Sequence, residues 1–192
     1  MTDQPNGFAD RASSREKAWI RSIAGAYRDV ITRMYCRMRF VILRQRFLEE
    51  IGQYLPDAGN VLDVGCGFGL FALYFAGTNP KIHVHGLDLN RARIEQARMV
   101  ARTLGVTNVT FEVGDARDLR WQGGLDAVYM LDLIHHIHRQ SARQLLERLA
   151  DRLHSGGRLI VKDIDTAPRY KTAFTWLLDW IMSGGEPVDY WP

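Results

Sequence analysis

Three glycines stand at alternate positions directly after a short apolar run that contains one acid. The stretch VLDVGCGFGLF occupies residues 61–71, with Asp63 inside the run and Gly65, Gly67 and Gly69 behind it. Glycine lets a backbone turn sharply and approach a ligand closely, and the N-terminus of a following helix presents unsatisfied N–H groups. Between a strand and a helix of an α/β sheet, such a turn indicates a nucleotide-binding site.

The spacing of these glycines differs from the dinucleotide-binding fingerprint. That fingerprint, G-x-G-x-x-G, requires a small residue at position 70, where this chain has Leu70. The observed spacing is G-x-G-x-G, with Asp63 two residues before the first glycine. The pattern therefore disfavours an NAD-dependent oxidoreductase, although the general expectation of a nucleotide ligand stands.

Short apolar segments alternate with helical patterns after residue 60, and this alternation must position the glycine turn. The strand candidates are residues 61–64, 83–87, 109–113, 127–131 and 158–162, and the helix candidates are residues 70–76, 91–104, 141–153 and 167–182. Repeated strand–helix–strand units predict an α/β fold with a doubly wound, mainly parallel sheet and helices on both faces.

The N-terminal part of the chain is strongly basic. Residues 11–46 contain ten Lys and Arg residues and only two acids, Glu16 and Asp29, which gives +8 in a chain whose total is +3. Ser13-x-x-Glu16 is a capping-box pattern, and the apolar residues that follow recur at helical spacing. We therefore expect a disordered tail over 1–14, a basic amphipathic helical extension over 15–56 and a ligand-binding core over 57–192.

The composition excludes several classes of protein. Hydrophobic residues make up 46% and charged residues 24%, as in a soluble globular domain. No apolar run approaches the roughly 20 residues that cross a bilayer, and residues 1–10 carry no signal-peptide pattern. Two cysteines, Cys36 and Cys66, cannot build a disulfide framework, so we expect a cytoplasmic location.

Five segments, in their order along the chain, resemble the motifs of class I methyltransferases that use S-adenosylmethionine. They are VLDVGCGFG (61–69), VHGLDLN (84–90), VTFEVGDARDL (109–119), LDAVYMLDLIHHI (125–137) and ADRLHSGGRLIVKD (150–163). The resemblance implies a Rossmann-like fold, S-adenosylmethionine as the cofactor and methyl transfer as the reaction. It also implies two further strands that form a C-terminal hairpin, and we expect that hairpin to be missing or truncated because the sequence stops at EPVDYWP.

Acids at the ends of the first three strands are the main expected cofactor contacts. A carboxylate at Asp88 can accept hydrogen bonds from both ribose hydroxyls of a nucleoside. The resemblance implies that Asp115 accepts from the adenine amino group, that Ala116 offers its backbone N–H, and that Asp63 lies near the cationic amino group; Asp63 alternatively caps the turn amides. We interpret Cys66 as packing within the turn and not as a nucleophile. The predicted cofactor-binding residues are Asp63, Gly65, Cys66, Gly67, Gly69, Asp88, Leu89, Asp115, Ala116 and Leu131.

Catalytic residues are less constrained, because the methyl group of a sulfonium is already activated. Alignment alone supplies roughly 7–11 kcal/mol of barrier reduction, and acid–base help is an addition. Candidates at the carboxyl ends of the fourth and fifth strands are Asp132, His135, His136 and Asp163. Either histidine alternatively lines the site or is a helix-start residue bonded to backbone. The HHIH run has no Cys or carboxylate at ligand spacing, so we predict no metal site.

The expected acceptor is a small, hydrophobic or lipid-like molecule. A basic amphipathic segment over residues 15–46, together with FTWLLDWIM (174–182), fits an anionic membrane surface, which would place the protein peripherally on the inner face of the membrane. Alternatively, the apolar stripe packs on the sheet or on a second subunit. Tyr27 and Tyr35 would in another arrangement close over the cofactor.

Three other functions stay open at the level of sequence. RNA methylation would use the basic charge, but the aromatic residues available for base stacking fall on the apolar stripe, which favours their burial and disfavours nucleic acid. These residues are Trp19, Tyr27, Tyr35 and Phe40. A non-catalytic module that binds S-adenosylmethionine or a nucleotide would fit the short C-terminus. An aminopropyl transferase has the same fold, but no polyamine-site acid cluster is evident.

Overall fold

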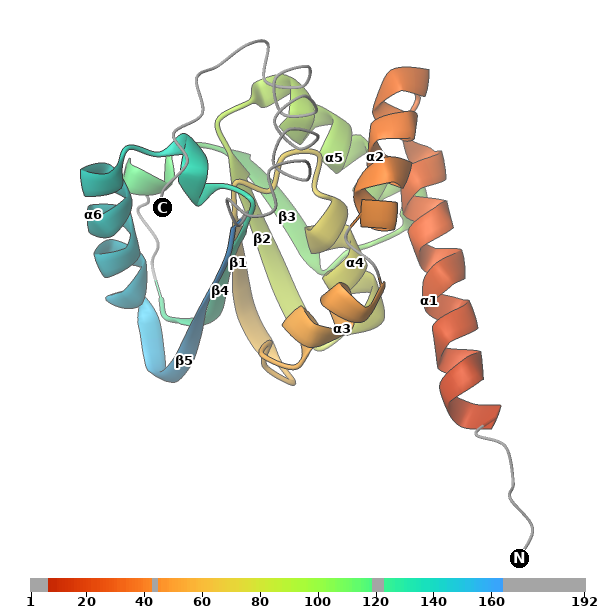
Figure 1. Cartoon of the computed structure of the whole chain (residues 1–192), viewed down its shortest axis with the longest axis horizontal. Coiled ribbons are helices and arrows are strands. Elements are labelled where there is room, and N and C mark those ends of the chain that lie inside the picture. Colours follow the sequence, from red (N-terminus) through yellow and green to blue (C-terminus); the bar gives the residue numbers. More distant parts are fainter. Residues whose placement is uncertain (1–6, 43–44, 119–122, 164–192) are drawn as a thin grey trace, which may run out of the picture.

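A single parallel sheet forms the centre of the molecule (Figure 1). The computed structural model describes residues 7–42, 45–118 and 123–163. Its strands are β1 (Gly59–Val64), β2 (Ile82–Asp88), β3 (Val109–Val113), β4 (Leu125–Leu131) and β5 (Leu153–Lys162). They lie in the order β3-β2-β1-β4-β5, and all four neighbouring pairs are parallel. The predicted doubly wound α/β architecture is therefore confirmed.

Helices cover both faces of this sheet, as buried parallel strands require. They are α1 (Gly7–Ala26), α2 (Val30–Ile42), α3 (Gln45–Gly52), α4 (Leu70–Thr78), α5 (Arg91–Leu104) and α6 (Arg139–Ala150). Alternate residues of β4 serve the two faces: Tyr129 packs into the core beneath α1 to α5, whereas Val128 and Met130 pack beneath α6. The short 3-10 turns Ala116–Asp118 and Ile134–His136 follow β3 and β4.

Helix α4 is apolar on all sides because it lies between the sheet and α1. Each residue from Leu70 to Ala76 is buried. Trp19 of α1 packs on the outer side of α4, where its indole N–H donates to the carbonyl of Leu73 at 3.3 Å. The basic N-terminal extension therefore continues the core of the sheet domain, since α1 completes the burial of the helix that follows the glycine turn.

The N-terminal extension begins earlier in the chain than expected. Helix α1 begins at Gly7, so residues 7–14 are helical where a disordered tail was expected; the good helix formers just before the capping box allow the extra turns. The rest of the extension forms consecutive helices, α1, α2 and α3. Asp29 starts α2 by accepting a hydrogen bond from the Thr32 N–H at 2.6 Å, which is N-cap geometry.

Two expectations for the C-terminal part lie outside the described residues. They are the helix over 167–182, which includes the FTWLLDWIM segment, and the state of the C-terminal hairpin. Among the described residues, no helix combines the length and the apolar character that crossing a membrane needs.

Because Trp19 packs on Gly77, we predict that replacing this helical glycine with alanine destabilises the protein, the reverse of the usual effect. A Cβ at Gly77 would lie 2.3 Å from Trp19 Cζ2. Gly77→Ala should therefore lower the free energy of unfolding, although Gly→Ala within a helix ordinarily raises it by about 1 kcal/mol. Urea denaturation of the single variant, and of the same change in a Trp19→Ala background, measures this. In the second background the substitution should stabilise the protein, because the clash is absent.

Gly25→Ala is the matched control for Gly77→Ala. Gly25 lies in α1, and nothing lies within 4 Å of the position that its Cβ would occupy. The control should stabilise the fold by roughly 0.5–1 kcal/mol. Equal stabilisation by Gly77→Ala and Gly25→Ala in the wild-type background would contradict the packing of α1 on α4.

Candidate functional site

The turn between β1 and α4 is held in a left-handed backbone conformation at each glycine. The φ angles of Gly65, Gly67 and Gly69 are 75°, 54° and 76°. This region disfavours residues with a Cβ. At Gly67 nothing lies within 4 Å of the position that a Cβ would take, so the bare backbone faces open space. The turn thus presents peptide groups, without side chains, at the carboxyl edge of the sheet.

Asp88, at the end of β2, ties this turn to the neighbouring strand. Its Oδ2 accepts a hydrogen bond from the Gly67 N–H and its Oδ1 accepts one from the Asn90 N–H, both at 2.8 Å. Each carboxylate oxygen has a second lone pair, so both oxygens keep acceptor capacity for a ligand hydroxyl. Asp88 therefore holds the shape of the turn and also borders the space in front of it.

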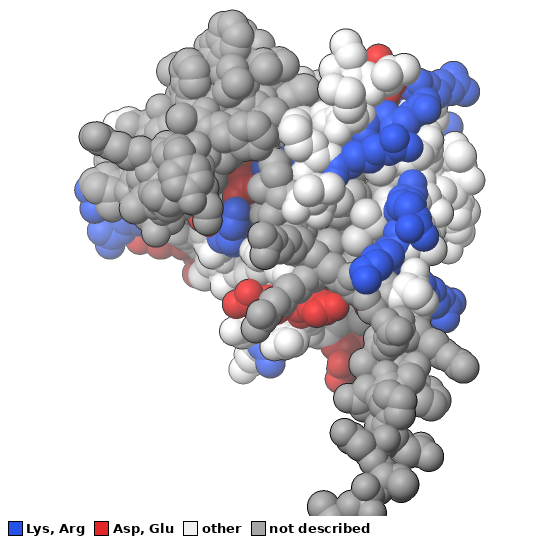
Figure 2. All heavy atoms as spheres, turned by 45° about the vertical axis from the view of Figure 1, so that its right-hand side comes forward, with Lys and Arg blue, Asp and Glu red and all other residues white. Residues whose placement is uncertain are grey.

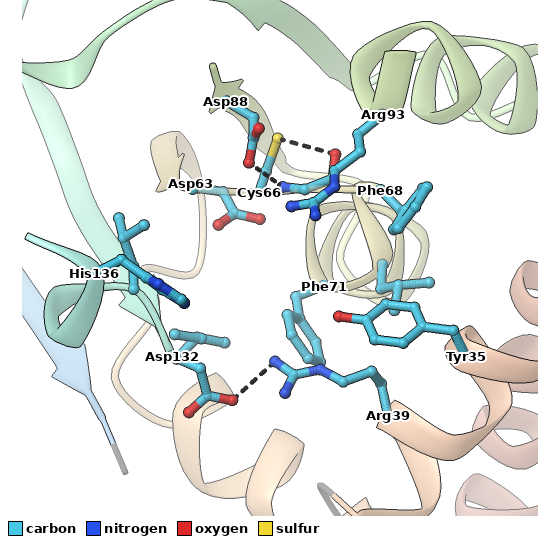
Figure 3. Close-up of a pocket in the computed structure, with 15 residues that line it drawn as sticks. Tyr35, Arg39, Asp63, Cys66, Phe68, Phe71, Asp88, Arg93, Asp132 and His136 are labelled. Carbon is cyan, nitrogen blue, oxygen red and sulfur yellow. Dashed lines mark hydrogen bonds and ion pairs between the residues drawn. The ribbon is translucent and has the colours of Figure 1, made fainter. Parts of the chain in front are cut away.

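Two adjoining hollows open at this edge of the sheet. One is a hollow of about 120 Å³ beneath α2 (Figure 3), and the other has about 500 Å³ and extends towards the ends of β2 and β3. They share five lining residues, which are Gly65, Asp88, Arg93, Leu133 and His136. We call them the inner hollow and the outer hollow.

The structure brings nearly all of the predicted cofactor residues to these hollows. Those that line the inner hollow are Asp63, Gly65, Cys66, Gly67, Asp88 and Leu131, and those that line the outer hollow are Gly65, Asp88, Leu89, Asp115 and Ala116. Gly69 lines neither. It precedes α4, and a Cβ there would lie 2.5 Å from the Phe111 ring, so its role in the turn is close packing.

Asp63 is a buried carboxyl beneath the turn. It is 2% exposed, and its Oδ2 has no hydrogen-bond partner within the described part of the chain. The pKa of Asp63 is raised from 3.8 to about 8. Burial is the main cause and the negative charge of Asp88 adds to it, whereas the Tyr129 hydroxyl and the Ala72 amide act in the opposite direction. A cation placed in the inner hollow would favour the ionised form, as the amino group of a methionine moiety would.

The outer hollow has an apolar floor and a paired acid. Leu89 is 68% exposed there, and this exposed leucine offers an apolar contact beside Asp88. Asp115 is held by Arg117 through its guanidinium, with Nη2 to Oδ2 at 2.5 Å, and this contact lowers the pKa of Asp115. An adenine amino group at Asp115 would have to share that carboxylate with Arg117.

Of the four catalytic candidates, Asp132, His135 and His136 have different surroundings, and Asp163 is a partner of His135. Asp132 has a positive φ of 55°, and its carboxylate binds Arg39 at 2.8 Å and also Lys162. His135 is 3% exposed, and Asp163 accepts a hydrogen bond from its backbone N–H at 2.9 Å and contacts its Nδ1. His136 lines both hollows. Asp132 and His136 therefore border the site, whereas His135 stands behind it.

Two side chains of α2 complete the inner hollow. Tyr35 and Arg39 reach in from one side and His136 from the other (Figure 3). The Tyr35 ring packs against Phe68 of the turn, with centroids 5.7 Å apart. Tyr27, in contrast, is fully buried and donates its hydroxyl to the Phe68 carbonyl at 2.7 Å.

Arg39 and Arg93 border the hollow without having been identified as site residues from the sequence. Arg39 is only 8% exposed and pairs with an acid 93 positions away. Arg93 lies over the Phe68 ring, 5.5 Å from its centroid. Neither carries a local signal, since each is one arginine among many in a basic amphipathic pattern. Proximity to the site comes only from the packing of α2 and α5.

Both cysteines are buried thiols. Burial raises the pKa of Cys36 to about 12 and raises the pKa of Cys66 well above its ordinary value. A thiol with so high a pKa forms little thiolate at neutral pH, and the thiolate is the nucleophile. The environment of Cys66 therefore favours its interpretation as a packing residue of the turn.

The raised pKa of Asp63 predicts a pH-dependent stability in the ligand-free protein. The folded state keeps a proton on this carboxyl up to about pH 8, whereas the unfolded state loses it near the ordinary value of 3.8. The contribution of the protonated Asp63 to the free energy of unfolding is thus fully present below pH ~4 and is lost as pH rises through about 8. Between pH 5 and 8, the free energy of unfolding of the wild type should fall relative to that of Asp63→Asn, by at most about 1.4 kcal/mol per pH unit.

Denaturation curves at a series of pH values test this expectation. Asp118→Asn is the control, because it removes an exposed acid from the same edge of the sheet; its pH profile should follow that of the wild type. If the profile of Asp63→Asn also ran parallel to the wild type, the buried carboxyl would not titrate as described.

Comparison with known proteins places the chain in a family. A family model described as a methyltransferase domain matches residues 61–157, just over half of the chain. The O-methyltransferase resE of Aspergillus sclerotiorum is 26% identical over 127 residues, which cover 64% of this chain and 47% of that protein. This chain spans about half the length of the curated relatives that it matches first.

Solved structures with the same fold agree with the match. The PH0226 protein from Pyrococcus horikoshii OT3 aligns with a TM-score of 0.62 and 26% identity, covering 74% of this chain and 60% of that one. PKMT2 from Rickettsia typhi, in complex with AdoHcy, aligns with a TM-score of 0.56 and 27% identity over 69% of this chain and 27% of that one. The matched span begins in β1 and includes the glycine turn and the acids that line the two hollows, Asp63, Asp88 and Asp115. The chain therefore belongs to the class I methyltransferases that use S-adenosylmethionine.

Proposed function

We propose that this protein transfers the methyl group of S-adenosylmethionine to a small, apolar or lipid-like molecule. The observation that carries the proposal is the inner hollow, where the glycine turn and the buried Asp63 meet an aromatic wall. That wall consists of Tyr35 from α2 and of Phe68 and Phe71 from the turn and α4. An acceptor with apolar surface fits a wall of this kind, because aromatic side chains bury large apolar areas.

The residues around the hollows fit the cofactor. Asp88 would accept from the ribose hydroxyls, and Leu89 would lie against the adenine. Asp63 would face the amino group, whose positive charge suits a buried carboxyl that otherwise has a raised pKa. When bound, S-adenosylmethionine supplies a methyl group that its positively charged sulfur has already activated.

The chain's own residues would align the acceptor and exclude water from it. Helix α2 closes one side of the inner hollow, and the pairing of Arg39 with Asp132 fixes that helix to the end of β4. A fixed wall lowers the entropic cost of aligning the acceptor with the methyl group. This alignment is the main task of the protein in the reaction. Because Asp132 is engaged by two cations, we assign it a positioning role.

His136 is the residue that we propose to accept a proton when the acceptor is a hydroxyl or an amine. It lines both hollows, and its ring lies 4.2 Å from that of His135, measured between centroids. His135 is held in turn by Asp163 at Nδ1 and at its backbone N–H. The pair His135 and Asp163 would therefore orient the 3-10 turn that carries His136.

RNA is the less favoured acceptor. Of the aromatic side chains on the basic extension, Tyr27 is fully buried and Phe40 is 6% exposed, so neither is available to stack on bases. A module that binds S-adenosylmethionine without transferring the methyl group is the remaining alternative, and it is distinguished by turnover.

A labelled-methyl experiment tests the proposal. With methyl-labelled S-adenosylmethionine and a cell extract, label should appear in small molecules that partition into organic solvent. His136→Ala should lower the rate by about 10²-fold or more, as loss of a general base does, and should leave the affinity for S-adenosylhomocysteine within about twofold. Label in RNA would contradict the proposed acceptor class, and binding without any transfer would favour the non-catalytic alternative.

A further inference from the structure

Helix α2 carries apolar residues on two opposite faces. One face is buried against the domain and includes Cys36 and Phe40, which are 0% and 6% exposed. The other face points to solvent and carries Val30, Ile31, Met34 and Val41, which are 67–74% exposed. Positions 30, 34 and 41 are separated by four and seven residues, so they share one side of a helix. We call these four residues the outer stripe.

The outer stripe is an unusual concentration of exposed apolar surface. Seven large hydrophobic side chains are exposed among the described residues, and four of them lie on this one helix of 13 residues. Scattered exposed hydrophobic residues need no explanation, but a group gathered on one side of a helix among charged side chains marks an interaction site. The apolar positions that recur at helical spacing in the sequence pack on the core along α1, as Ile23 does, whereas along α2 those at 30, 31, 34 and 41 remain outside.

The charges around the outer stripe are almost entirely positive. Arg28 precedes α2, and both Arg28 and Arg37 are exposed. Arg37 is seven residues from Val30, so it lies on the same side of the helix as Val30, Met34 and Val41, within the outer stripe. Lys17 and Arg21 of α1 are exposed as well, and α1 packs beside α2. Figure 2 shows Lys and Arg side chains among uncharged ones on the side of the molecule where α1 and α2 lie. The nearby acid Asp29 is engaged as the N-cap of α2.

We propose that the outer stripe docks the protein on an anionic lipid bilayer. Apolar side chains on one side of a helix, with cationic side chains along its edges, insert shallowly at the boundary of headgroups and acyl chains, while the cations pair with anionic lipids. Docking would lay α2 parallel to the membrane. The inner face of the same helix carries Tyr35 and Arg39 into the site, so the hollow would lie directly behind the docked surface.

Other occupants fit the surface less well. Nucleic acid would satisfy the arginines but would leave four exposed apolar side chains against a charged, hydrated polymer. A second copy of the chain, related by a two-fold axis through the stripe, would bring the same arginines of both chains together. An anionic bilayer satisfies the apolar stripe and the positive rim at once. The docking does not depend on the proposed methyl transfer, because it concerns the solvent face of α2 alone.

Vesicle co-sedimentation tests the docking with the full chain. At an ionic strength of about 0.15 M, the wild type should bind vesicles of phosphatidylcholine with phosphatidylserine and should bind pure phosphatidylcholine at least about tenfold more weakly. Ile31→Glu with Met34→Glu places two negative charges within the outer stripe and should weaken binding to the anionic vesicles by at least about tenfold. Both side chains are exposed, so the thermal midpoint should stay unchanged.

Gln140→Glu with Gln144→Glu is the matched control. It adds the same charge on exposed positions of α6, on the other face of the sheet, and should bind anionic vesicles as the wild type does. Three results would overturn the proposal: no binding of the wild type to anionic vesicles, unchanged binding of the Ile31 and Met34 variant, or a wild-type dimer that this variant dissociates while vesicle binding is absent.

Discussion

The turn between β1 and α4 is the constraint on which the rest of the site depends. The chain must leave a buried strand, pass over the buried Asp63 and enter α4 without placing a side chain in front of the sheet. Left-handed φ angles at Gly65, Gly67 and Gly69 make this path available. The hydrogen bond from the Gly67 N–H to Asp88 then fixes the turn to the end of β2. One carboxylate thus defines the shape of the binding edge and contributes to its chemistry.

A second set of contacts joins the N-terminal extension to this edge. Asp132 at the end of β4 binds Arg39 from α2 and Lys162 from β5, so three separate elements meet at one buried carboxylate. Buried ion pairs add little net stability, because desolvation offsets the attraction, but breaking one leaves a costly unpaired charge. The contact therefore specifies where α2 lies more than it strengthens the fold. That position gives α2 its two roles, as a wall of the site on one face and as an exposed apolar surface on the other.

The sequence predicts the parts of this structure that depend on local pattern. The parallel sheet follows from the alternation of strand and helix patterns. The grouping of Asp63, Asp88 and Asp115 follows from their places at or near the ends of its strands, because the carboxyl ends of parallel strands share one edge. The buried and exposed faces of α2 are harder to tell apart from the sequence. Apolar residues occur on both sides of this helix, so their spacing does not indicate which side is buried. The pairing of Arg39 with Asp132 joins residues 93 positions apart and has no local signature. Periodicity also does not distinguish His135 from His136; the contact with Asp163 does, and it arises only in the folded chain.

The central claim is that the glycine turn and the Asp88 carboxylate together hold S-adenosylmethionine. Titration calorimetry of the wild type, Asp88→Ala and Asp88→Asn with S-adenosylmethionine tests this claim most directly, with Asp118→Ala as a matched change at an exposed acid nearby. Asp88→Ala should weaken binding by at least about tenfold, because charge-assisted hydrogen bonds to the ligand are lost, and Asp88→Asn should weaken it less because one acceptor oxygen remains. Asp118→Ala should bind as the wild type does. An unchanged affinity in Asp88→Ala, or no binding of S-adenosylmethionine to the wild type, would contradict the account.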